Sequence, residues 1–111
     1  MNAVNLIGRL TKDPDTRYGQ QSQMAITRFT LAIDRGKDKN GENRADFPQV
    51  MCFGKVAELA DKYLKKGQRV GVIGHLQTGS YEKDGHKVFT TDVVAERLEF
   101  IDWPKDDVPF R

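Results

Sequence analysis

The stretch ADFPQVMCFGKVAELADKYLKKG, residues 45–67, decides the fold because its periodicity changes halfway along. In its first half side chains alternate, so Phe47 and Phe53 are expected on one face of a strand and Val50 and Cys52 on the other. In its second half, residues 55–66, the apolar side chains recur at the spacing of one helix face: Val56, Leu59, Ala60 and Tyr63. The stretch therefore predicts a half-buried strand, then a short helix that ends at Gly67 and packs on the core.

Period-2 alternation surrounds this stretch on both sides. Residues 12–23 contain Asp13-Pro14-Asp15 and Gly19, so they predict a turn and loop. Residues 35–44, RGKDKNGENR, are entirely polar with four basic side chains, and they predict a long exposed loop. Strands are predicted over residues 4–10, 24–34, 45–54, 68–82 and 86–95, the last with an apolar pattern that continues to Ile101.

The resulting order is three strands, one helix and two strands. This is the element order of the OB-fold, an all-β, five-stranded Greek-key barrel with one short helix between strands three and four. An SH3-like barrel, which usually lacks this helix, and an α+β sandwich are the alternatives. The 111 residues fit one domain, which we expect over residues 1–102. Residues 103–111, WPKDDVPFR, have two prolines and no periodicity, and predict a short acidic tail.

Composition excludes several classes of protein. The chain is 38% hydrophobic and 31% charged, as is typical of soluble globular proteins. No apolar run approaches the ~20 residues of a membrane helix, and the first residues lack the pattern of a signal peptide. We therefore expect a cytoplasmic protein with no membrane contact. The single cysteine, Cys52, excludes an internal disulfide and a cysteine-built metal cluster, and we expect it to be buried.

Charge is unevenly distributed although the net charge is only +2. Residues 1–70 carry a net +5 and residues 71–111 a net −3. This asymmetry favours a basic working surface followed by an acidic tail, but an uneven solvated surface would give the same pattern.

Catalytic chemistry has no support in the sequence. There is no Walker-type phosphate loop and no HExxH motif, and His75 and His86 are not spaced as a metal pair. We therefore expect no catalytic residues, no metal and no cofactor, and a protein that is not an enzyme.

Aromatic and basic residues instead predict a surface for nucleic acid. If Val50 and Cys52 fill the barrel, Phe47 and Phe53 lie on its outer face, roughly 20 Å apart at ~3.3 Å per residue. Bases stack on such exposed rings, and Tyr81, near a hairpin end, is a third candidate. Alternatively, this face is the interior or packs on a partner subunit. Together with the basic loop at residues 35–44, the rings have the composition of a groove for single strands.

The chain resembles the bacterial single-stranded DNA-binding protein family, of the replicative homotetrameric type. The resemblance covers nearly all of residues 1–102. The matching stretches are MNAVNLIGRLTKDPDTRY, ITRFTLAIDR, ADFPQVMCFGKVAELADKYLKKGQRVGVIGHLQTGSYE and VFTTDVVAERLEFI.

The resemblance implies which residues contact DNA. The family's base-stacking positions fall on Phe47, Phe53 and Tyr81. Six basic side chains are the expected phosphate contacts: Arg28, Arg35, Lys37, Lys39, Lys55 and Lys66.

The chain also departs from the family's pattern. Gly36 stands near the position of a further family aromatic. Gln49, Gln77 and Gly79 stand where relatives carry basic residues. These departures predict weaker binding than in relatives with a full set.

The C-terminal DDVPF resembles the acidic tip with which the family recruits replication and repair proteins. The implied partner contacts are Asp106, Asp107, Pro109 and Phe110. Arg111 departs from the pattern, since it separates Phe110 from the terminal carboxylate.

The expected function is therefore sequence-nonspecific binding of single-stranded DNA in replication, recombination and repair, by a cytoplasmic, nucleoid-associated homotetramer. The first strand, near a sheet edge, has backbone groups that pairing across a two-fold axis would satisfy. The alternatives are a primosome-type OB adaptor that acts mainly through protein contacts, and an RNA-binding protein of cold-shock type.

Overall fold

The computed structural model describes residues 1–102, which form seven strands and one helix. The elements are β1 (Val4–Leu10), β2 (Asp15–Tyr18), β3 (Ala25–Lys37), β4 (Asn43–Asp46), β5 (Gln49–Phe53), α1 (Lys55–Tyr63), β6 (Arg69–Lys83) and β7 (His86–Phe100). Within these residues, no helix is long and apolar enough to cross a membrane.

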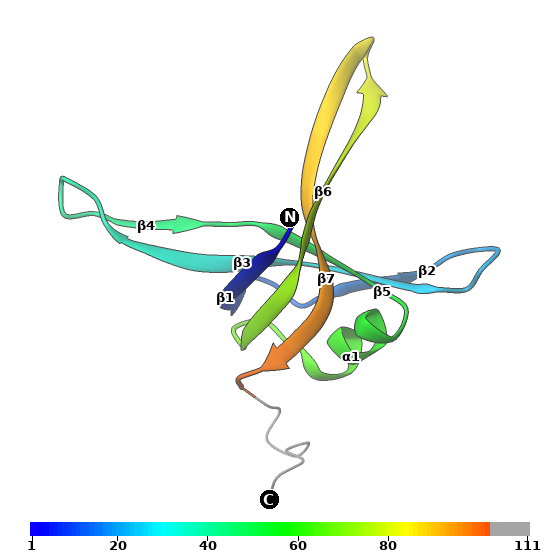
Figure 1. The fold of residues 1–111 in the computed structure, drawn as a ribbon, viewed down its shortest axis with the longest axis horizontal. Coiled ribbons are helices and arrows are strands. Elements are labelled where there is room, and N and C mark those ends of the chain that lie inside the picture. The colour runs from blue at the N-terminus through cyan, green and yellow to red at the C-terminus, as the bar shows by residue number, and fades with distance from the viewer. Residues whose placement is uncertain (103–111) are drawn as a thin grey trace, which may run out of the picture.

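Five of the strands close into a barrel (Figure 1). The order β1-β6-β7-β5-β3 returns to β1, because Arg9 and Leu10 of β1 also pair with β3. The β5–β7 pair is parallel and the other pairs are antiparallel. This is the five-stranded barrel with one short helix that the element order predicts, so the fold class is confirmed.

The barrel interior is filled by the alternate side chains of its strands. Val50 and Cys52 of β5 are fully buried, together with Leu31 of β3 and Val70 of β6. Burial raises the pKa of the Cys52 thiol to about 12, so the thiol stays protonated at neutral pH and packs as a small apolar group. The alternation expected for this strand is therefore confirmed: its other face points out of the barrel.

Helix α1 follows β5 after a single glycine. Gly54 has a φ of +63°, in the left-handed region that glycine adopts at little cost, and its N–H donates to the carbonyl of Ala25 at 2.9 Å. Thr27 is fully buried on β3, and its hydroxyl lies 2.9 Å from the Ala57 carbonyl of the helix. These two hydrogen bonds hold the helix against β3, and they set the direction in which the chain leaves β5.

The helix differs in detail from the expectation. It ends at Tyr63 rather than Lys66, so Gly67 lies in the following turn instead of directly at the helix end. Leu59 is 45% exposed, whereas Ala57 and Ala60 are fully buried. The small alanines allow the helix to approach the barrel closely. The buried face of the helix is therefore centred on Ala57 and Ala60, and Leu59 lies outside it.

Two polar regions that the sequence predicts as loops contain strands. β2 lies within residues 12–23 and pairs with β3 over its whole length. Residues 35–44 hold the end of β3 and the start of β4, which pair with each other. Neither region has an apolar alternation, because both ribbons are solvent-exposed on most of their surface.

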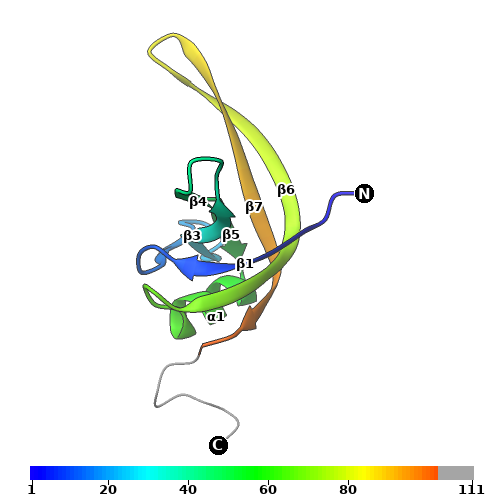
Figure 2. The same cartoon turned by 90° about the vertical axis from the view of Figure 1, so that its left-hand side faces the viewer.

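Besides the β2/β3 hairpin, the β3/β4 arm and the β6/β7 arm extend from the barrel (Figures 1 and 2). The pairing register shifts where each arm leaves the barrel, between Asp34 and Gly36 in one and between Ile73 and Gly74 in the other. Beyond its shift every β6 residue from Leu76 onward is exposed. Leu76 is therefore exposed although it stands an even number of residues after the buried Val70 and Val72.

Candidate nucleic-acid interface

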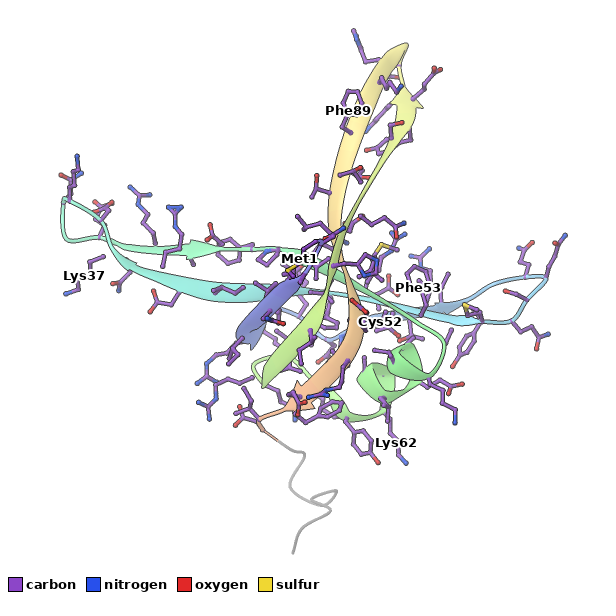
Figure 3. The ribbon with its side chains drawn as sticks, in the orientation of Figure 1. Met1, Lys37, Cys52, Phe53, Lys62 and Phe89 are labelled. Atoms are coloured by element: carbon purple, nitrogen blue, oxygen red, sulfur yellow. The ribbon has the colours of Figure 1, made fainter. Side chains whose placement is uncertain are left out.

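The outer face of β5 starts the candidate site. Phe53 and Met51 are half-buried, Gln49 is exposed, and Phe47, just before the strand, is 63% exposed. Figure 3 shows Phe53 at the end of β5 that leads into α1. Both phenylalanines of the predicted platform therefore have accessible ring surface, and neither belongs to the fully buried core.

Strands β3 and β2 extend this face sideways. The pairing register sets Ile26 of β3 beside Phe53, and Arg28 beside Met51. On the other side of β3, Arg17 is the partner of Ile26 and Asp15 the partner of Arg28. The phenylalanines thus lie on a wider surface that also carries apolar, basic and acidic side chains.

Three hollows in this surface meet at Arg28. The first, of about 620 Å³, is lined by Phe47, Gln49 and Arg28 and also by Lys12 and Asp13. The second, of about 250 Å³, lies between β2 and β3. Its lining side chains are Asp15, Arg17, Ile26 and Arg28.

The third hollow, of about 550 Å³, connects the barrel to the β6/β7 arm. Arg28 and Gln49 line its barrel side, and Tyr81, Thr90 and Asp92 line its arm side, with Thr91. Tyr81 is 52% exposed. Arg28 and Gln49 therefore belong to both the hollow of Phe47 and the hollow of Tyr81, and the two rings lie along one continuous groove.

The predicted basic contacts do not all lie in this groove. Arg28 is at its centre, and Lys55 begins the helix two residues after Phe53. The backbone N–H of Lys66 donates to Asp13 at 2.8 Å, which sets this residue at the border of the first hollow. The structure therefore places Arg28 within the groove, Lys55 close in the chain to Phe53, and the Lys66 backbone beside the first hollow.

The other three predicted contacts lie on the β3/β4 arm. Arg35 and Lys37 line a separate, smaller hollow on that arm, and Lys39 follows towards its tip. Figure 3 shows Lys37 far from the barrel. The guanidinium of Arg35 lies 3.6 Å from the Asp46 carboxylate, so its charge is partly neutralised within the arm.

Sequence reasoning missed every charged residue of the groove except Arg28: Lys12, Asp13, Asp15, Arg17 and Asp92. The Arg17 side chain is 82% exposed and lies 3.4 Å from the Asp15 carboxylate, and it was missed because β2 was predicted as a loop. Asp92 was missed because the spacing of a β-strand does not reveal which neighbouring strand its side chains face. The register that makes Asp92 the partner of Gln77 is the signal that identifies it.

The groove carries nearly balanced charge. Its basic side chains are Lys12, Arg17 and Arg28, and its acidic ones are Asp13, Asp15 and Asp92. Such a surface attracts a polyanion less than a uniformly basic groove does. Exposed rings must therefore supply a large share of any affinity for a nucleic acid.

No group of three or more His, Cys, Asp or Glu side chains within residues 1–102 has the arrangement of a metal site. The predicted partner contacts Asp106, Asp107, Pro109 and Phe110 lie outside the described residues.

Comparison with known proteins gives a consistent result. A single-stranded DNA-binding protein of Clostridium tetani is 47% identical over 104 residues, which cover 93% of this chain and 72% of that protein. Single-stranded DNA-binding protein 2 of Clostridium acetobutylicum is 47% identical over 107 residues, covering 96% of this chain and 80% of that one.

A solved structure titled "Plasmodium falciparum SSB complex with ssDNA" superposes with a TM-score of 0.82 and 27% sequence identity, covering 92% of this chain and 96% of that one. The model of the single-strand binding protein family matches residues 1–101. This chain therefore belongs to the single-strand binding protein family.

Proposed function

We propose that this chain binds single-stranded DNA without sequence preference, and coats and protects it during replication, recombination and repair. The observation that carries the proposal is the continuous groove that joins Phe47 to Tyr81 through Arg28. Bases stack on exposed rings while cations contact the backbone, which is how sequence-tolerant OB-folds hold a single strand. Family membership supports the same ligand. The activity is binding, without a catalytic step.

Each predicted residue has a role in this proposal. Phe47 and Tyr81 stack bases along the groove, and Phe53 stacks a base on the outer face of β5 beside Ile26. Arg28 contacts a phosphate at its centre, and Lys55 and Lys66 do so at its borders. The cations of the β3/β4 arm contact the strand where it leaves the groove: Arg35, Lys37 and Lys39.

Titration with oligo-dT of graded length at two salt concentrations tests the proposal. We expect binding whose log K falls with log salt by about 0.7 for each phosphate contact. Phe47→Ala and Phe53→Ala should each weaken binding by about 1–3 kcal/mol and leave the circular dichroism spectrum unchanged. Unfolding of either variant would assign that ring to the core and remove it from the platform.

A primosome-type adaptor, which acts mainly through protein contacts, is the second candidate. It is favoured by the three carboxylates that line the hollows and by Gln49 at a position where the resembling family carries a cation. Absence of oligo-dT binding by the folded wild-type chain would favour this adaptor.

We also propose that the protein is a homotetramer. The support is β1, of which Val4–Gly8 pairs with β6 on one side while pairing with β3 on the other side begins only at Arg9. Ile7, in that segment, is 65% exposed. A second copy that pairs with this edge would satisfy its backbone groups and cover Ile7. Light scattering at micromolar concentration tests this: a monomer or a dimer mass would contradict it.

The acidic tip is proposed to recruit replication and repair proteins, with the whole assembly on the nucleoid in the cytoplasm. Deleting residues 106–111 should leave oligo-dT affinity equal or slightly higher and abolish capture of helicase or primase partners. Deleting Arg111 alone should strengthen that capture, because Phe110 then bears the terminal carboxylate. Unchanged capture after the full deletion would contradict the proposal.

A further inference from the structure

The β6/β7 arm exposes a second aromatic ring, on the face opposite Tyr81. In the register of the arm Tyr81 is the partner of Val88, and Phe89 is the partner of Ser80. Partners point to the same face and successive residues to opposite faces, so Tyr81 and Phe89 lie on opposite faces of the arm at nearly the same height. Phe89 is 75% exposed, the largest exposed fraction of any phenylalanine or tyrosine within residues 1–102. Figure 3 shows it projecting from the arm well away from the barrel.

Each ring has a lysine two residues nearer the tip of the arm. Lys83 shares the face of Tyr81, and Lys87 shares the face of Phe89. The ammonium of Lys87 lies 5.5 Å from the centroid of the Phe89 ring. Glu82, the partner of Lys87, adds one carboxylate to that face. The two faces of the arm therefore repeat one arrangement, in which a ring for stacking stands beside a cation.

We propose that Phe89 and Lys87 form a second binding surface for single-stranded DNA, which takes a strand that has passed Tyr81 and continues around the arm. The inference rests on the proposed function. The occupant is a nucleic acid because the surface lies at nearly the same height of the arm as Tyr81, on the other face of the same two strands. It also has the stacking-plus-cation composition of single-strand sites.

A second copy of the chain fits this surface less well. Cores of protein interfaces are depleted in lysine, and a two-fold contact centred on Phe89 would bring two Lys87 ammonium groups together. A phosphate backbone, by contrast, gains from Lys87 and leaves the ring free to stack on its other side.

The test compares two oligo-dT lengths. One has about 6 nucleotides, near the smallest site of one OB-fold, and the other about 30, well beyond the largest. Phe89→Ala should weaken binding of the long oligonucleotide at least fivefold more than binding of the short one. Ser80→Ala, at the partner position on the same face, is the matched control and should change neither. Lys87→Gln should lower the salt slope for the long oligonucleotide by about 0.7.

A spectroscopic readout separates a direct contact from a structural effect. The chain has one tryptophan, Trp103, so a Trp103→Phe, Phe89→Trp variant reports on position 89 alone. Its fluorescence should be quenched by the long oligonucleotide and much less by the short one.

Three outcomes would overturn the proposal. Equal losses at both lengths would assign Phe89 to the stability of the arm, and an unquenched tryptophan would exclude stacking. Concentration-dependent association that Phe89→Ala abolishes, with unchanged affinity for the long oligonucleotide, would assign the surface to a second copy. Failure of the proposed function itself is distinguishable, because the wild-type chain would then bind neither length.

Discussion

The β3/β4 arm and the β6/β7 arm extend from the same barrel (Figure 1). They differ in the side chains that they expose: paired charges on the first and aromatic rings on the second. On the β3/β4 arm, residues 34–46 hold four basic and four acidic side chains. Two of its arginines form ion pairs, Arg35 with Asp46 at 3.6 Å and Arg44 with Asp38 at 2.8 Å. Charge paired within the arm gives a passing phosphate less net attraction than free cations would.

The β6/β7 arm instead exposes rings. Tyr81 and Phe89 are 52% and 75% exposed, and a two-stranded ribbon has no further layer that would cover both of its faces. A ligand that buries these rings therefore gains apolar and stacking energy that the β3/β4 arm does not offer. We therefore expect the number of cations in a loop to be a poor guide to its share of the binding energy.

The largest expected effect is on the free energy of unfolding. It compares one glycine from each arm, near the point where that arm leaves the barrel. A Cβ atom at Gly74 would collide with the Val94 carbonyl of the neighbouring strand, whereas a Cβ atom at Gly36 would meet open space at a φ of +83°. Gly74→Ala should therefore lower the free energy of unfolding by about 3 kcal/mol, and Gly36→Ala by about 1–2 kcal/mol. Urea denaturation measures both. Equal losses of unfolding free energy in the two variants would mean that the backbone at position 74 can move away from the Val94 carbonyl at little cost.

The second effect compares ligand contacts on the two arms. Tyr81→Ala should weaken oligo-dT binding by about 1–3 kcal/mol, the contribution of one stacked base. Lys39→Ala should cost less than about 0.5 kcal/mol at ~0.15 M salt, because an exposed charge is screened at that ionic strength. Isothermal titration with one oligonucleotide gives both values. A larger loss for Lys39→Ala would reverse the assignment of the two arms.

The sequence predicts the barrel well because alternation in apolar strands reports directly on burial. Val50 and Cys52 occupy the interior as their period requires, and that result alone sets Phe53 outside. Where no apolar residue alternates, as in β2 with its sequence DTRY, the strand exists only through its pairing with β3, which a local pattern does not encode.

The same limit applies to the site. Phe47, Phe53 and Tyr81 are visible in the sequence as rings at outward positions, but the hollows that connect Phe47 to Tyr81 depend on which strands lie side by side. Arg28 becomes central only because Gln49 and the β6/β7 arm are its neighbours. Leu59 shows the converse, since its helical spacing suits burial but the close approach of Ala57 and Ala60 turns it outward.

The third effect concerns Asp92, the acidic side chain at the base of the β6/β7 arm. Asp92 lines the same hollow as Arg28 and is the partner of Gln77. Asp92→Asn should tighten oligo-dT binding by about 0.5–1 kcal/mol, since it removes a negative charge close to the path of the phosphates.

A double-mutant cycle sharpens this prediction. Gln77→Arg alone should steepen the salt slope by less than the ~0.7 of one new phosphate contact, because the guanidinium faces Asp92 across the arm. In the Asp92→Asn background the same substitution should give the full increment. Equal increments in both backgrounds would show that Asp92 and position 77 do not interact, and no increment in either would show that position 77 does not face the phosphates.

The smallest effect is confined to the tip of the β3/β4 arm. The Asp38 carboxylate accepts hydrogen bonds from the backbone N–H groups of Asn40 and Glu42, at 2.8 and 3.0 Å, and from Arg44 Nε at 2.8 Å. These bonds, that from Glu42 above all and then that from Arg44, hold the pKa of Asp38 below its ordinary value. The folded tip therefore favours the ionised carboxylate, and the stabilisation is present above the ordinary aspartate pKa and is lost as the pH falls through the lowered one.

Asp38→Asn should accordingly reduce hydrogen-exchange protection of the Asn40 and Glu42 amides at neutral pH, and acidification of the wild-type chain below about pH 4 should do the same. Glu42→Gln is the matched control, because its carboxylate lies 3.6 Å from Arg44 but, unlike that of Asp38, does not hold the two amides. Oligo-dT affinity should stay unchanged in both variants if the β3/β4 arm contributes little to binding. A loss of affinity that follows the loss of protection at the tip would contradict this expectation. It would mean that the β3/β4 arm binds DNA through its ordered shape rather than through its charge.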